Sequence, residues 1–164
     1  MHKAEAKRIW QANRTAEAAE RQARYDRFVQ ITEEAHAAGL AAGEAAVPRP
    51  MVVHNPSTGH TYAPVMDGVC GFAWVTIRPG TSSYARWLVK RGIGSKAYRG
   101  GIQIWVSAFG QSMERKEAYA RAFVDALKAA PELDGIRAYA GSRIDRKSTR
   151  LNSSHSSVSR MPSS

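Results

Sequence analysis

A run of basic residues in the middle of the chain has the composition of a surface that binds polyanions. Between residues 78 and 99 the sequence holds six Lys or Arg and no acid. Clustered cations bind a polyanion because they release its condensed counterions, although a solvent-exposed basic helix would have the same composition. Nearby glycines would let the backbone come close to a phosphate chain. The predicted phosphate contacts are Arg86, Lys90, Arg91, Lys96 and Arg99.

Alternating side chains in the second half of the chain predict a sheet face that carries aromatic rings. Successive residues of a strand point to opposite faces, so Trp105 shares a face with Gln103, and Tyr139 shares one with Arg137. Rings stack on unpaired bases while cations meet phosphates, which is how single-stranded nucleic acids are bound. The predicted stacking residues are Tyr98, Trp105 and Tyr139.

The aromatic face has a second interpretation. Phe72 and Trp74 can join it from a neighbouring strand. A face so rich in rings can also be core, covered by the long N-terminal helix. The two interpretations differ in whether the rings meet solvent.

Residues for catalysis or metal binding are sparse. His54, His60, Asp67 and Cys70 lie near one another in the sequence, but their spacing matches no common zinc pattern. Paired carboxylates are also lacking here, because residues 46–110 contain a single acid. No glycine pattern matches a phosphate-binding loop or a dinucleotide fingerprint. The sequence therefore predicts no metal, no cofactor and no enzymatic activity.

A small number of helices and strands must position these residues. Residues 3 to about 38 lack proline and are rich in Ala, Glu, Arg and Gln, which predicts one long helix that ends at Gly39 and Gly43. Large apolar residues recur at helical spacing only from Tyr25 onward, so the first half of this helix is expected to be solvated or to bind a partner. The other predicted elements are helices after Ser82 and Ser112 and strands at 51–54, 60–65, 69–77, 102–109 and 136–140.

This order of elements predicts an α+β fold. A long N-terminal helix is followed by a four- or five-stranded antiparallel or mixed sheet with two helices on one face. The expected segments are the N-terminal helix at 1–47, an α+β domain at 48–144 and a tail at 145–164. The tail has 8 Ser among 20 residues, so it is expected to be disordered. Its back-translation resembles read-through of a sequencing adapter, which predicts that the natural C-terminus is missing.

Composition narrows the classes of function further. A chain of 164 residues suits one domain, and a single Cys excludes an internal disulfide framework. No stretch approaches the roughly 20 apolar residues that span a bilayer, and the charged N-terminus does not resemble a signal peptide. The net charge is +10, of which residues 46–110 supply 7 basic groups against 1 acid. A soluble basic protein is the expectation.

Several short motifs occur in a fixed order: Gly71-Phe72-Ala73-Trp74-Val75, Ile104-Trp105-Val106, Gln111-Ser112, Arg115-Lys116-Glu117-Ala118-Tyr119-Ala120, and Ala138-Tyr139 with Ser142-Arg143. Together they resemble motifs of uncharacterised small proteins encoded by tailed bacteriophages and by metagenomic contigs. The resemblance covers about residues 38–144 and implies a phage or prophage origin, hence the cytoplasm of a bacterial host, without a defined activity. It therefore assigns no functional residues.

Two functions follow as predictions. The first is a small basic accessory protein of the phage type that binds nucleic acid with little sequence preference. The second is a non-enzymatic interaction protein, whose N-terminal helix mediates self-association or binds a host or virion protein. An exposed aromatic face favours the first function, and a face covered by the N-terminal helix favours the second.

Overall fold

A computed structural model of the chain describes residues 2–145. It has the expected α+β class, with a long N-terminal helix, an antiparallel four-stranded sheet and further helices. The elements are α1 (Lys3–Ala45), β1 (Gly71–Arg78), α2 (Ser83–Lys90), β2 (Ser95–Lys96), β3 (Ile102–Trp105), α3 (Met113–Ala129), the 3-10 helix η1 (Pro131–Leu133) and β4 (Arg137–Ile144). Expectations for the segment after Asp145 lie outside the described residues.

The sheet has the strand order β2-β3-β1-β4, and every neighbouring pair is antiparallel. From β1 onward the chain therefore follows a β-α-β-β-α-β course with β1 and β3 at the centre, the topology called ferredoxin-like or split β-α-β. Because α2 and α3 are the two crossover connections, they pack on one face of the sheet, as the element order predicted.

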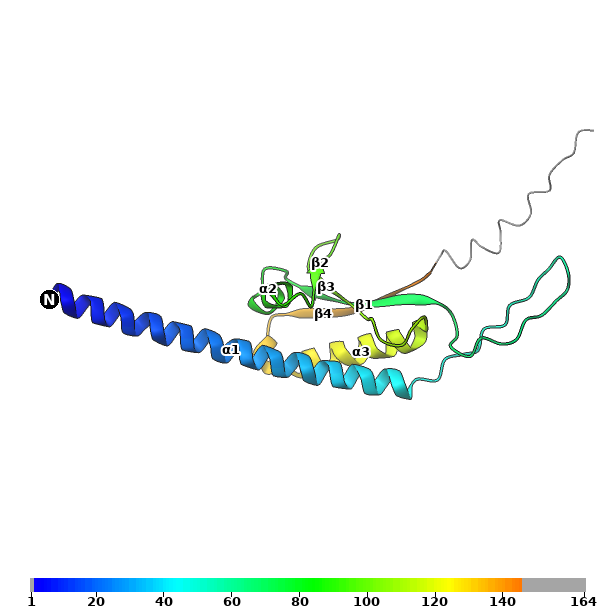
Figure 1. Cartoon of the computed structure of the whole chain (residues 1–164), viewed down its shortest axis with the longest axis horizontal. Helices are drawn as coiled ribbons and strands as arrows, with labels where there is room; N and C mark the ends of the chain where they lie inside the picture. The colour runs from blue at the N-terminus through cyan, green and yellow to red at the C-terminus, as the bar shows by residue number, and fades with distance from the viewer. Residues whose placement is uncertain (1, 146–164) are drawn as a thin grey trace, which may run out of the picture.

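Helices α1 and α3 lie side by side on this same side of the sheet (Figure 1). In β1 the residues Ala73, Val75 and Ile77 are buried beneath the helices, and the residues between them are more exposed. The helices contribute the large core residues Phe28, Ile31, Tyr84, Trp87, Leu88, Tyr119, Phe123 and Leu127. The N-terminal helix thus completes the core on the side opposite the aromatic face.

Two hydroxyl groups inside the helical layer have polar partners. The hydroxyls of Tyr84 and Thr32 are 2.9 Å apart, and burial raises the pKa of Tyr84 to about 12. His36 Nδ1 lies 2.5 Å from the hydroxyl of Tyr119, whose pKa burial also raises. Both contacts join α1 to another helix, so they hold it in one position on the core.

Helix α1 continues through the two glycines that were expected to end it. Gly39 and Gly43 are buried, and a Cβ at Gly39 would lie 2.7 Å from the ring of Tyr119. At Gly43 the ring of Phe109 occupies the corresponding space. These glycines therefore allow close packing of α1 and do not end it. The helix runs on to Ala45, within the predicted segment 1–47, because a tertiary contact outweighs the low helix propensity of glycine.

The first half of α1 extends beyond the rest of the molecule (Figure 1). Every described residue from His2 to Arg24 is exposed, and the first buried one is Phe28. We call residues 3–24 the N-terminal arm.

Deletion of residues 1–24 is expected to change the free energy of unfolding by no more than about 0.5 kcal/mol, because the arm contributes no buried side chain. Urea denaturation of the full chain and the shortened chain tests this. Loss of cooperative unfolding in the shortened chain would contradict it and would indicate that Ile9 and Trp10 belong to the core.

The other predicted strands differ in extent. Residues 51–54 and 60–65 form only two isolated bridges, Met51 with Val65 and His54 with Thr61, because a lone two-stranded hairpin has no third strand or core to stabilise it. Strand β3 stops at Trp105, and Phe109 has a φ of 68° and packs against Tyr119. Strand β4 runs four residues past its predicted end at Ala140 because it pairs along the whole of β1.

Candidate functional site

The sheet face away from α1 and α3 carries a mixture of rings and cations. Alternation along β1 and β3 selects its members there, because their neighbours in sequence are buried under the helices. In β4 the members are the residues paired with those of β1. We call this surface the open face; it consists of Phe72, Trp74, Thr76 and Arg78 from β1, Gln103 and Trp105 from β3, and Arg137, Tyr139, Gly141 and Arg143 from β4. None of these positions holds an acid.

Three rings of the open face contact one another across the two central strands. Trp74 and Trp105 are paired in register, with ring centroids 5.2 Å apart and planes inclined by 51°. Phe72 meets Trp105 edge to face at 6.3 Å. These three residues form what we call the aromatic platform. The indole of Trp105 is 51% exposed, so solutes can reach it.

A glycine on β4 makes room for the platform. Gly141 pairs with Trp74, and a Cβ at that position would lie 2.7 Å from the indole ring. The ring therefore lies over the backbone of β4, where any other side chain would displace it. In the next row, Tyr139 stands beside Thr76 and is 48% exposed, which extends the accessible aromatic surface to the edge strand.

Arginines border the platform at both ends of the face. Arg143 is paired with Phe72 at one end, and Arg78 is paired with Arg137 at the other. Arg78 Nη2 donates a hydrogen bond to the carbonyl of Arg99 at 2.8 Å. Among the described residues none of these three arginines forms an ion pair. Like charges placed opposite one another are unfavourable, so this end of the sheet attracts anions.

The structure separates the predicted site residues into two groups. Trp105 and Tyr139 lie on the open face, and the turn between β2 and β3, which contains Tyr98 and Arg99, rises above the sheet on the same side (Figure 1). Lys96 is paired with the buried Ile102, so it shares the helical side at the sheet edge.

The predicted contacts on and just after α2 lie in the helical layer instead. Arg86 and Lys90 are exposed on this helix, and the guanidinium of Arg91 stands 5.8 Å from the ring centroid of Trp87. Arg91 also lines a groove together with Glu33 of α1. The structure does not bring Arg91 to the aromatic platform.

Several members of the open face are not among the nucleic-acid contacts predicted from the sequence. Phe72, Trp74 and Arg137 were visible in the alternation but were not assigned a role, and Arg78 was counted only within the basic run. Arg143 was not considered because the last strand was expected to end before it. Its partner across the sheet, Phe72, could not be named without the pairing of β1 with β4.

The histidines and the cysteine of the first half do not converge. His54 Nδ1 lies 2.7 Å from Thr61 Oγ1, and the ring of His60 packs against Tyr62. Among the described residues no three His, Cys, Asp or Glu side chains come together as metal ligands would. The contact of His54 with Thr61 joins residues 51–54 to residues 60–65 in the segment between α1 and β1, whereas the contact of His60 with Tyr62 lies within residues 60–65.

Comparisons with known proteins add no assignment. No protein-family model, curated protein or solved structure matches the chain. Within residues 2–145, none of the helices combines the length and apolar character that crossing a lipid bilayer demands.

Proposed function

We propose that the chain binds single-stranded nucleic acid, with little sequence preference, through the open face. The observation that carries the proposal is the exposure of Trp105 and Tyr139 on a face that has three arginines and no acid. Rings provide stacking surfaces for unpaired bases, and the arginines neutralise phosphates. Helix α1 packs on the opposite face and leaves these rings uncovered, which supports the proposal.

The chemistry of the open face favours stacking over base reading. Its hydrogen-bonding side chains other than arginine are few: Thr76, Gln103, the hydroxyl of Tyr139 and the indole N–H groups of Trp74 and Trp105. Every base has a π face, so stacking tolerates any sequence. A duplex presents no unstacked bases, so we expect weaker binding of double strands at the same salt concentration.

Two analogies support the proposal: the arrangement of aromatic residues on a four-stranded sheet, and the resemblance of the sequence to phage proteins. RNA-recognition motifs also use a four-stranded sheet whose aromatic residues stack about two or three bases. Similar topology alone does not determine function, so the argument depends on the side chains. The resemblance to phage proteins adds the proposal that this is an accessory protein acting in the cytoplasm of a bacterial host.

Replacement of Arg78, Arg137 and Arg143 together by Gln is expected to reduce the salt dependence of binding. With a slope of about 0.7 per phosphate for single strands, three lost contacts should lower the log-log slope by about 2. Fluorescence anisotropy with a labelled oligonucleotide, over a series of salt concentrations, measures this slope.

The matched control replaces Arg86, Lys90 and Arg91 by Gln, which removes the same charge from the helical layer. Its slope should stay near that of the unchanged protein. If the control loses the slope and the open-face variant does not, the strand binds at α2 and the proposed site is wrong. Absence of binding by the unchanged protein at low salt would contradict the proposed function itself.

A further inference from the structure

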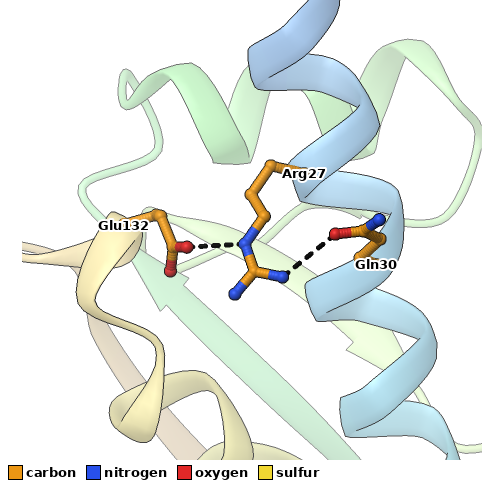
Figure 2. Close-up of polar contacts among 3 residues, drawn as sticks. All are labelled: Arg27, Gln30 and Glu132. Carbon is orange, nitrogen blue, oxygen red and sulfur yellow. Dashed lines mark hydrogen bonds and ion pairs between the residues drawn. The ribbon is translucent and has the colours of Figure 1, made fainter.

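The N-terminal arm leaves the domain at a defined point. Arg27 Nε contacts Glu132 Oε1 of η1 at 2.5 Å, and Arg27 Nη1 donates to Gln30 Oε1 at 3.0 Å (Figure 2). The hydrogen bond to Glu132 raises the pKa of Arg27, and the same bond lowers the pKa of Glu132. Residues before this pair project from the domain and are exposed apart from the half-buried Tyr25.

The core-facing side of α1 becomes basic where the helix leaves the domain. Lys7, Arg14 and Arg21 precede Phe28 at intervals of seven residues. Seven residues are almost two helical turns, with a drift of only about 20° per interval, so these cations lie on the helix side that Phe28 buries. Lys3 and Trp10 flank Lys7 on the same side. We call Lys3, Lys7, Trp10, Arg14 and Arg21 the basic stripe.

The stripe is suited to a polyanion. Of the three acids in the arm only Glu17 lies beside it, and helical spacing places Glu5 and Glu20 on other sides. No ion pair within the described structure neutralises the arm's cations. The guanidinium of Arg14 stands 4.8 Å from the ring centroid of Trp10, which is 56% exposed. The arm therefore repeats the pairing of rings and arginines seen on the open face.

A hollow at the base of the arm connects it with one end of the sheet. Arg24 and Arg27 line this hollow, whose volume is about 380 Å³, together with Ser82 and Ile136. Glu132 and Asp134 also line it, and Glu132 is the ion-pair partner of Arg27. Ile136 directly precedes Arg137, and Ser82 follows Arg78 by four residues. A strand that leaves the open face at the Arg78–Arg137 end would pass this hollow, next to Arg24, on its way to the arm.

We infer that the N-terminal arm is a second contact surface for the phosphate backbone of the same single strand, with the ring of Trp10 available for stacking. The inference rests on the proposed function of the open face. A second copy of the chain is a poorer occupant, because two basic stripes would bring like charges together. The arm is about 32 Å long at 1.5 Å per residue, so only strands longer than the open face can reach it.

The test uses the full chain with Lys7, Arg14 and Arg21 replaced together by Gln, which preserves helix propensity. Binding is measured with a strand of about 20 nucleotides and with one of about 4, the low end of the site size of a single domain. For the long strand the log-log salt slope is expected to fall by about 2. For the short strand the slope and the affinity should be unchanged.

Two single variants of the arm, Arg14→Gln and Arg8→Gln, provide the control for this experiment. Arg14 and Arg8 are both exposed in the arm, but helical spacing places Arg8 on the far side from the stripe. Only Arg14→Gln should lower the slope, by about 0.7. Equal losses from both variants would overturn the inference, since they would indicate general attraction by net charge.

The remaining outcomes separate the two proposals. If the triple arm variant leaves long-strand binding unchanged while the open-face variant weakens it, the arm is not a contact and the proposed function stands. If neither strand binds the unchanged protein, the proposed function fails and the inference fails with it. A free protein that is dimeric by light scattering, and becomes monomeric in the triple variant, would overturn the inference in favour of self-association.

Discussion

Replacement of Trp105 by Ala is expected to weaken binding of a single strand by about 5- to 150-fold. This range corresponds to the roughly 1–3 kcal/mol of binding free energy that is lost per base when the stacking side chain is replaced by alanine. The indole is about half exposed, 51%, so the fold should tolerate the change. Fluorescence titration at fixed salt measures the affinity, and thermal unfolding checks that the variant is folded.

Two tyrosines provide a matched control for this result. Tyr139 lies on the open face and is 48% exposed, and Tyr62 lies in the segment between α1 and β1 and is 49% exposed. Tyr139→Ala should weaken binding in the same direction as the Trp105 variant, whereas Tyr62→Ala should not change it. Equal effects at the two tyrosines would indicate nonspecific adhesion to exposed rings and would refute the open face as a site.

Replacement of Phe28 by Ala is expected to lower the free energy of unfolding by about 3–5 kcal/mol, the usual cost of removing a buried ring. Phe28 is 4% exposed and contacts Tyr84 and Trp87 edge to face, with centroids 5.2 and 5.7 Å away. The free energy of unfolding of a small domain is only about 5–15 kcal/mol in total, so the variant should lose much of its stability. Chemical denaturation measures the change.

The control for this variant is an apolar residue of the same helix. Ile9 lies in the arm and is 49% exposed, so Ile9→Ala should stay within about 0.5 kcal/mol of the unchanged protein. A small loss for Phe28→Ala as well would mean that α1 does not pack on α2 as described.

The class of fold and the identity of most core strands could be predicted from local patterns. The two-residue alternation placed Trp105 and Gln103 on one face, and the structure confirms this placement. It could not decide which face α1 covers, because that choice depends on contacts between residues far apart in sequence. Phe28 against Trp87 is such a contact.

The structural roles of two glycines could not be predicted from the sequence. Gly39 indicated a helix end by propensity, yet it is buried in the helix where the ring of Tyr119 approaches. Gly141 had no predicted role, yet it is the residue over which Trp74 lies. In both cases the function of the glycine is the space it leaves for a ring on another element, which no local pattern records.

The pairing of Arg78 with Arg137 at one end of the open face has a consequence for how salt acts on the free protein. Two guanidinium groups that face one another repel, and that repulsion opposes folding whenever no anion is bound. Added salt screens the repulsion, so it favours the folded domain. In the proposed complex the same screening would weaken the phosphate contacts of these arginines, so ionic strength would shift folding and the proposed binding in opposite directions through one pair of side chains.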